Sequence, residues 1–206
     1  NLISSNTISA AARVLKALPY VESVQVGIKL PDTVNIMIEE ESVVYAIKSS
    51  DGQWWMMDSD GRVVEQANNA KAATATQVLG VTLEAPTVNE KGVATEMTPS
   101  ETNELGELIP VSTTGAQRLT AALQILKALE NNDIVGEAAS VDVTSTEDII
   151  LWYGTRYQVN LGDTSRLDYK VDCMNDAILQ MSDYQSGVLD ISFTIWPNQV
   201  GYTPFA

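Results

Sequence analysis

The first part of the chain changes from a helical to an extended spacing of apolar residues. Apolar residues recur three to four positions apart over about 7–18, and Pro19 disfavours continuation, so a helix is predicted there. Apolar and polar residues then alternate over 24–30 and 34–38, on either side of a Pro31-Asp32 turn. This pattern predicts a helix followed by an amphipathic β-hairpin.

A longer series of strands follows the acidic run at 39–41. Asp51-Gly52 is a preferred dipeptide for a tight hairpin turn, and Gly154-Thr155 separates two further alternating runs. Strands are predicted over 43–48, 53–58, 62–64, 78–83, 139–143, 148–153 and 157–161.

Two helices interrupt these strands. The first is predicted over about 115–130, where leucines form one stripe and Thr113 or Thr114 can cap the start. The second is predicted over about 165–182, with Thr164 or Ser165 as its cap. Because hairpin turns join the strands more often than crossover helices do, the second unit is predicted to be a mainly antiparallel β domain with two helices.

The chain as a whole is predicted to have an α+β fold in two parts. A helix-plus-hairpin unit covers residues 1–41, and the larger β domain covers 42–206. Within the second part, 85–112 is rich in threonine and proline and carries five glutamates against the single Lys91, with Glu84 just before it. This composition favours a mobile acidic surface insertion.

Charge and composition exclude several function classes. The 206 residues contain 12 Lys plus Arg, 27 Asp plus Glu and no histidine, which gives a net charge of −15. Phosphate backbones and anionic lipids would repel such a chain, so nucleic-acid binding is not expected. No apolar run is long enough to span a membrane, but the chain starts at Asn1 without Met, so we expect it to be a piece from which an export or anchoring segment has been removed.

Candidate catalytic chemistry is sparse. Asp58–Gly61 resembles part of a calcium loop, but Met56 stands where an acidic ligand belongs, so a hairpin turn is the better interpretation. Cys173 lies at the edge of a helical apolar stripe and is interpreted as an inert thiol. Nucleotide-binding and serine-nucleophile motifs are absent. No catalytic, metal or cofactor-binding residue is predicted, and no cofactor is expected.

The C-terminal end carries the clearest signal for an interaction. Leu189, Ile191, Phe193 and Ile195 alternate with polar residues, which predicts a strand with one buried face. If the tail 199–206 leaves this strand uncovered, its open edge can capture another chain by strand addition. The alternative is that the tail folds back as one more strand.

These pieces, in this order, resemble the extracytoplasmic part of the FtsQ/DivIB family of bacterial cell-division proteins. Residues 18–26 followed by 30–39 look like the second half of a POTRA domain, although Glu40, Glu41 and Ser42 stand where the family has a basic residue and a proline. The resemblance implies that the first strand and helix of a POTRA domain are not among these residues. Residues 153–163, 167–170 and 187–192 look like the family's β domain.

The resemblance implies a non-enzymatic scaffold of the division apparatus. Such proteins are anchored in the cytoplasmic membrane by one helix, which these 206 residues lack, and act on its extracytoplasmic face at the division septum. FtsL and FtsB/DivIC-like proteins are the implied partners. The implied partner-binding residues lie on the last strands and are Ser192, Phe193, Thr194, Trp196 and Tyr202.

Two other functions remain as alternatives. A secreted cell-wall or carbohydrate-binding module would need Trp54, Trp55 or Trp152 to form an exposed flat platform. A carboxylate-dependent hydrolase would need two acids about 5–10 Å apart in a cleft, and no pair stands out in the sequence.

Overall fold

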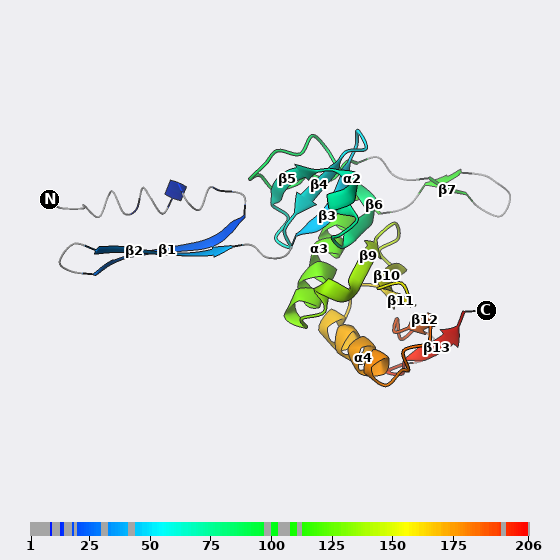
Figure 1. Ribbon diagram of the computed structural model, residues 1–206. Coiled ribbons are helices and arrows are strands. Elements are labelled where there is room, and N and C mark those ends of the chain that lie inside the picture. The colour runs from blue at the N-terminus through cyan, green and yellow to red at the C-terminus, as the bar shows by residue number, and fades with distance from the viewer. Residues whose placement is uncertain are drawn as a thin grey trace.

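The computed structural model of the chain contains a two-stranded hairpin and, after it, one large twisted sheet (Figure 1). The residues that it describes are 9, 13–14, 18, 20–29, 33–40, 44–96, 100–102, 108–110, 113–194 and 197–205. The helix predicted over 7–18 falls almost wholly outside this part of the chain.

The hairpin is formed by β1 (Val21–Lys29) and β2 (Thr33–Glu40), which pair antiparallel as a two-stranded sheet. Val24 lies opposite Ile38 and Val26 opposite Ile36. Since side chains alternate between faces along a strand, these apolar residues share one face of the hairpin. The predicted amphipathic hairpin is therefore present.

The second sheet has nine strands in the order β13-β12-β11-β10-β9-β6-β3-β4-β5. Three neighbouring pairs, β3/β6, β6/β9 and β11/β12, are parallel and the other five are antiparallel, so the mainly antiparallel domain is confirmed. The strands are β3 (Tyr45–Ser49), β4 (Trp54–Met57), β5 (Val63–Ala67), β6 (Gln77–Leu83), β9 (Ala138–Asp142), β10 (Ile149–Tyr153), β11 (Tyr157–Gly162), β12 (Gly187–Asp190) and β13 (Gly201–Pro204).

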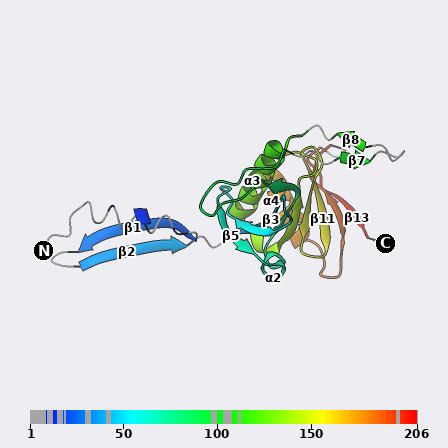
Figure 2. The ribbon, with the colours of Figure 1, turned by 90° about the horizontal axis from the view of Figure 1, so that it is seen from above.

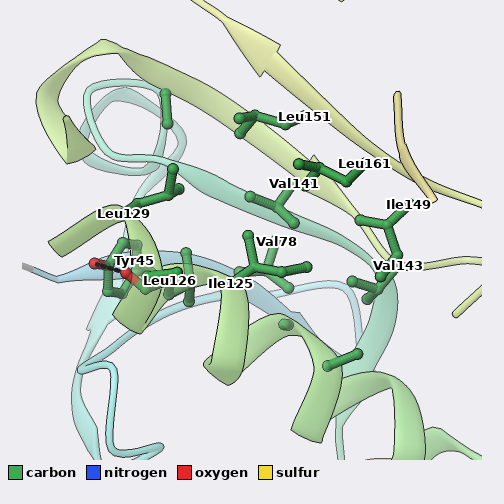
Figure 3. Close-up of a cluster of buried hydrophobic side chains, with 14 of the residues drawn as sticks. Tyr45, Val78, Ile125, Leu126, Leu129, Val141, Val143, Ile149, Leu151 and Leu161 are labelled. Carbon is green, nitrogen blue, oxygen red and sulfur yellow. Dashed lines mark hydrogen bonds between the residues drawn. The ribbon is translucent and has the colours of Figure 1, made fainter. Parts of the chain in front are cut away.

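Two long helices pack together against this sheet, α3 (Gly115–Asn131) and α4 (Leu167–Leu179) (Figure 2). Their apolar faces and the inward residues of the strands form one continuous core (Figure 3). The ring of Tyr45 belongs to this core, and its hydroxyl donates a hydrogen bond to Glu130 Oε1 at 2.7 Å. A short α2 (Asn69–Ala72) covers a second, smaller cluster, and a 3-10 turn, η1 (Val135–Glu137), precedes β9.

The two predicted helices differ in how they begin. Thr114 caps α3 as predicted, and Thr114 with Gln117 forms a reciprocal capping box. Neither predicted cap serves α4, which begins after Arg166 in a left-handed conformation without a side-chain cap. The reason is that both the N–H and the hydroxyl of Ser165 donate to Asp163 Oδ1 instead.

The start of the predicted acidic insertion belongs to the folded sheet. The N–H of Asn89 donates to the carbonyl of Val63, and Ala94 is buried in the main core. Residues 85–96 are therefore held against the sheet, unlike the mobile loop expected there. Their main-chain hydrogen bonds to β5 and β6 compensate for a polar composition that buries little apolar surface. Further on, β7 (Ser100–Thr102) and β8 (Leu108–Pro110) pair as a separate two-stranded sheet. Mobility in the rest of the insertion stays a prediction.

The predicted last strand over 189–195 is wrong in its extent and in its position. The strand, β12, ends at Asp190 because the Asp190 carboxylate accepts hydrogen bonds from the N–H and the hydroxyl of Ser192, which turns the chain out of the sheet. It is also paired on both sides, with β11 and with β13. The alternative, in which the tail folds back as one more strand, is the one that the structure shows.

Candidate functional site

The open edge at the C-terminal end of the large sheet is β13. It pairs antiparallel with β12 on one side, and it is the last strand in the order of the sheet. Its main chain runs from Gly201 to Pro204, with Phe205 N–H still donating to Ser186 O at 3.2 Å.

Alternation along β13 determines which main-chain groups face outward. In an antiparallel pair every second residue exchanges hydrogen bonds with its partner strand. Counting back from Phe205, the residues bonded to β12 are Thr203 and Gly201, so the N–H and C=O of Tyr202 and the C=O of Pro204 point away from the sheet. Proline has no N–H. The described edge of β13 therefore offers two acceptors, the C=O groups of Tyr202 and Pro204, and one donor, the Tyr202 N–H.

The side chains of β13 divide between the core and the outer face. The Tyr202 ring packs against the core, and its hydroxyl donates to Ser186 O at 3.1 Å. Thr203 is exposed on the opposite face. Just beyond the strand, Phe205 stacks on Trp152 with ring centroids 6.2 Å apart. Tyr202, which was expected near an edge strand over 189–195, lies on the edge strand β13 itself and contributes its main chain to the edge and its ring to the core.

The loop between β12 and β13 carries three of the predicted partner-binding residues. Ser192 is tied to Asp190, Phe193 adopts a positive φ of 60°, and Thr194 is exposed. These three residues lie beside the edge, not on it. Trp196, and Ile195 before it, lie outside the described residues.

Arg166 fixes this loop against the start of α4. Its guanidinium lies over the rings of Tyr169 and Phe193, at 4.4 and 5.5 Å from their centroids, and Nη1 donates to Asn198 Oδ1 at 2.9 Å. This cluster is not predicted by the sequence. Nothing in the local pattern links Arg166 to a loop about thirty residues later, because the contact depends on the tertiary fold.

The other edge of the large sheet is less open. At β5 the Val63 N–H donates to Glu90 O and the Val63 C=O accepts from Asn89 N–H, both at 2.8 Å. An isolated bridge also joins Arg62 to Lys91. Since the segment before Ala94 covers the start of β5 in this way, β13 is the more accessible edge.

The three candidate tryptophans do not form the flat platform that a carbohydrate-binding module needs. Trp55 packs against the main core, and Trp54 is half-buried under Lys48, whose ammonium lies 4.9 Å from the ring centroid. Trp152 is half-buried and covered in part by Phe205.

The carboxyl groups give no support to a hydrolase. A general acid needs a raised pKa. Within the described part of the chain, every carboxyl whose pKa departs from its ordinary value is lowered, by hydrogen bonds from neighbouring groups first; these are Asp51, Asp60, Glu65 and Asp163. Asp58, the first residue of the calcium-like turn, accepts hydrogen bonds from the N–H and Nε of Arg62.

The described residues lack a metal-binding cluster and a membrane-spanning helix. They contain no group of three or more acidic or cysteine side chains placed to hold a metal ion. They also contain no helix whose length and apolar character suffice to cross a membrane.

The fold and the open edge define a class of protein: a POTRA-like hairpin unit joined to a mixed β domain with a free C-terminal strand. Comparison with known proteins agrees. Residues 1–41 match the model of the FtsQ-type POTRA domain. The chain is also 24% identical, over 178 residues, to the cell division protein DivIB of Clostridium tetani.

That match covers 85% of this chain and 59% of the relative, so the chain spans under two thirds of the relative's length. Both matches agree with the resemblance seen in the sequence: the chain is similar to the FtsQ/DivIB cell-division proteins.

Proposed function

We propose that this protein is a non-enzymatic scaffold of the division apparatus that binds a partner chain by strand addition at β13. The observation that carries the proposal is the free outer edge of β13, with the N–H and C=O of Tyr202 facing away from the sheet. An unpaired edge binds an extended peptide through main-chain hydrogen bonds, while neighbouring pockets supply specificity.

The surroundings of β13 offer such a pocket. A depression beside the strand is lined by Asn160, Val188, Asp190 and Val200 together with β13 itself. Val188 and the Phe205–Trp152 pair lie on the outer face of the sheet beside this depression. Aromatic and apolar side chains of a partner can pack against them. Ser192, Phe193 and Thr194 border the edge through the loop that Arg166 holds.

The family relationship supports the choice of partner. FtsL and FtsB/DivIC-like proteins are the proposed binders, at the extracytoplasmic face of the cell membrane, with the protein anchored by one helix outside residues 1–206. The proposal also keeps the division of the chain near residue 42. It is supported by the separate sheets before and after this point and by the POTRA match that ends at residue 41.

The test uses the exported part of each candidate partner and measures amide hydrogen exchange residue by residue. In the free protein the Tyr202 amide should exchange faster than those of Gly201 and Thr203, which β12 holds. Partner binding should slow the Tyr202 amide strongly and leave the other two nearly unchanged. If Tyr202 exchange is the same with saturating partner, strand addition at β13 does not occur.

A charge on the edge strand gives an independent measurement. Thr203→Lys should weaken binding about tenfold, since a lysine on an edge strand opposes pairing with another chain. Gln66→Lys places the same charge on the opposite edge strand, β5, and should leave affinity unchanged. Equal losses in both variants would indicate a general charge effect and would count against the edge.

A further inference from the structure

A buried arginine on α3 has no carboxylate partner among the described residues. Arg118 is 1% exposed, and its Nη1 and Nη2 donate to the carbonyls of Gly80 and Thr113, each at 2.9 Å. Its Nε–H meets no acceptor in that part of the chain. Burial lowers the pKa of this guanidinium, and only the more distant charge of Glu96 acts in the opposite direction. Buried charges are normally paired, so this one calls for an explanation.

A cavity of about 240 Å³ adjoins Arg118. It exists because the pairing of β3 with β6 skips three residues: Ile47 pairs with Val78, but Lys48 pairs with Thr82. The excursion contains Gly80, whose positive φ of 82° is strained for any side chain. Residues 78–81 of β6 form part of its wall, and the rest of the lining is Arg118, Lys48, Thr82, Thr95, Gly115 and Thr144.

Three potential donors belong to residues that line this cavity. Thr95 Oγ1 is buried and lacks a partner within the described structure, as Arg118 Nε does. Gly115, also in the lining, is the first residue of the 17-residue helix α3. The capping box occupies the N–H groups of Thr114 and Gln117, which leaves that of Gly115 without a protein acceptor among the described residues. A helix start concentrates free N–H groups and positive potential.

We propose that this cavity binds a small oxyanion of the carboxylate or phosphate type, whose charge compensates that of Arg118. Lys48 also lines the cavity, but its ammonium lies over the Trp54 ring, so Arg118 is the cation that the site offers. A chain with a net charge of −15 repels anions as a whole, so a buried cation with free donors beside it marks a specific site. The site is separate from the β13 edge, and its test does not depend on the proposed partner.

The experiment follows the Nε–H resonance of Arg118 in a ¹⁵N-labelled protein while sodium phosphate, or in a second arm sodium acetate, replaces sodium chloride at constant ionic strength. A saturable shift of this resonance is expected, with that of Arg156 on the surface unchanged. The arm with the lower saturating concentration identifies the preferred oxyanion. A shift that is linear in both arms, or no shift, would overturn the proposal.

Variants separate binding from a general salt effect. The same anion should raise the melting temperature of the wild type, because a ligand of the folded state stabilises it by mass action. Thr95→Val, which removes one of the unpartnered donors, should weaken apparent affinity about tenfold, and Arg118→Met should abolish it. Lys127→Gln, on the far end of α3, is the matched control and should bind as the wild type does.

Equal stabilisation in Thr95→Val and the control would contradict the site, even if Arg118→Met fails to fold. Glu96→Gln tests whether Glu96 itself supplies the compensating charge. This variant should bind the anion more tightly, since it removes a competing negative group. If neither the wild type nor Glu96→Gln binds the anion, the proposal is overturned.

Discussion

Lys170 on α4 holds Asp163 in the turn that follows β11. Lys170 is 1% exposed, and its Nζ donates to Asp163 Oδ1 at 2.9 Å and to the carbonyls of Leu161 and Asp163, each at 2.8 Å. The buried ammonium thus has an acceptor for each of its three protons. Gly162, in the same turn, packs so closely on Ser192 that a Cβ would lie 2.8 Å from the Ser192 Cβ. The turn therefore supports the loop that leads to the edge strand.

Replacing Lys170 by methionine should destabilise the protein. The variant keeps the length of the side chain but leaves two buried carbonyls without donors, and losing charge-assisted hydrogen bonds of this kind costs about 2–3 kcal/mol. Urea unfolding followed by circular dichroism measures the change. Lys127→Met removes an exposed ion pair with Asp60 and should change the midpoint little. Equal losses in the two variants would show that Lys170 has no special structural role.

The pH dependence of stability should reflect Asp163. A hydrogen bond from the Ser165 hydroxyl, followed by that from Lys170, lowers the pKa of Asp163 from 3.8 to about 2. Because the folded pKa is below the unfolded one, this carboxylate contributes stability above about pH 4, and that contribution is lost as the pH falls towards 2. Solvent screens the exposed carboxylate, so the effect is modest.

The comparison that isolates this effect is wild type against Asp163→Asn. The difference in their free energies of unfolding should be constant above about pH 5 and should shrink between pH 4 and 2. A difference that does not change over this range would mean that the Asp163 charge does not contribute. Asp148→Asn, a change of the same kind outside this turn, provides the reference for general loss of charge.

Some of these elements were predictable from the sequence because local signals agree with the fold. The leucine stripe and Thr114 define α3 within one residue at each end. The hairpin β1/β2 is likewise specified by its own alternation and by its turn. In both cases, spacing, capping and turn chemistry all favour the same structure.

The candidate site was harder to predict, because it depends on contacts between distant segments. The alternation over 189–195 continues past the point where Asp190 bonds Ser192 and ends the strand. Nothing within Gly201–Pro204 indicates a strand by itself; its pairing with β12 supplies the reason. The sequence also does not indicate that Arg118 is buried without a carboxylate partner, since an arginine on a helix normally lies in solvent.

Shortening the acidic insertion tests which part of it belongs to the fold. Deleting 88–110 with a short Gly/Ser bridge should cause a large loss of thermal stability, because it removes the pairing of Asn89 and Glu90 with Val63 and the buried Ala94. Deleting only 99–110, which contains the separate β7/β8 sheet, should cost little. Calorimetry of both variants gives the answer, and similar melting temperatures would mean that 88–96 adds nothing to the core.

Gly187 offers a way to loosen the edge strand without touching its outer groups. A Cβ at this position would lie 2.2 Å from Thr203 O and 2.8 Å from the Tyr202 ring, so an alanine forces β13 away from β12. Overpacking of this kind costs about 1–3 kcal/mol. Gly187→Ala should therefore speed amide exchange at Gly201 and Thr203, and it should weaken partner binding because the template strand is displaced. Gly136→Ala is the matched control, since a Cβ there meets nothing within 4 Å. If Gly187→Ala disorders β13 by the exchange criterion while partner affinity is unchanged, the partner binds elsewhere on the domain.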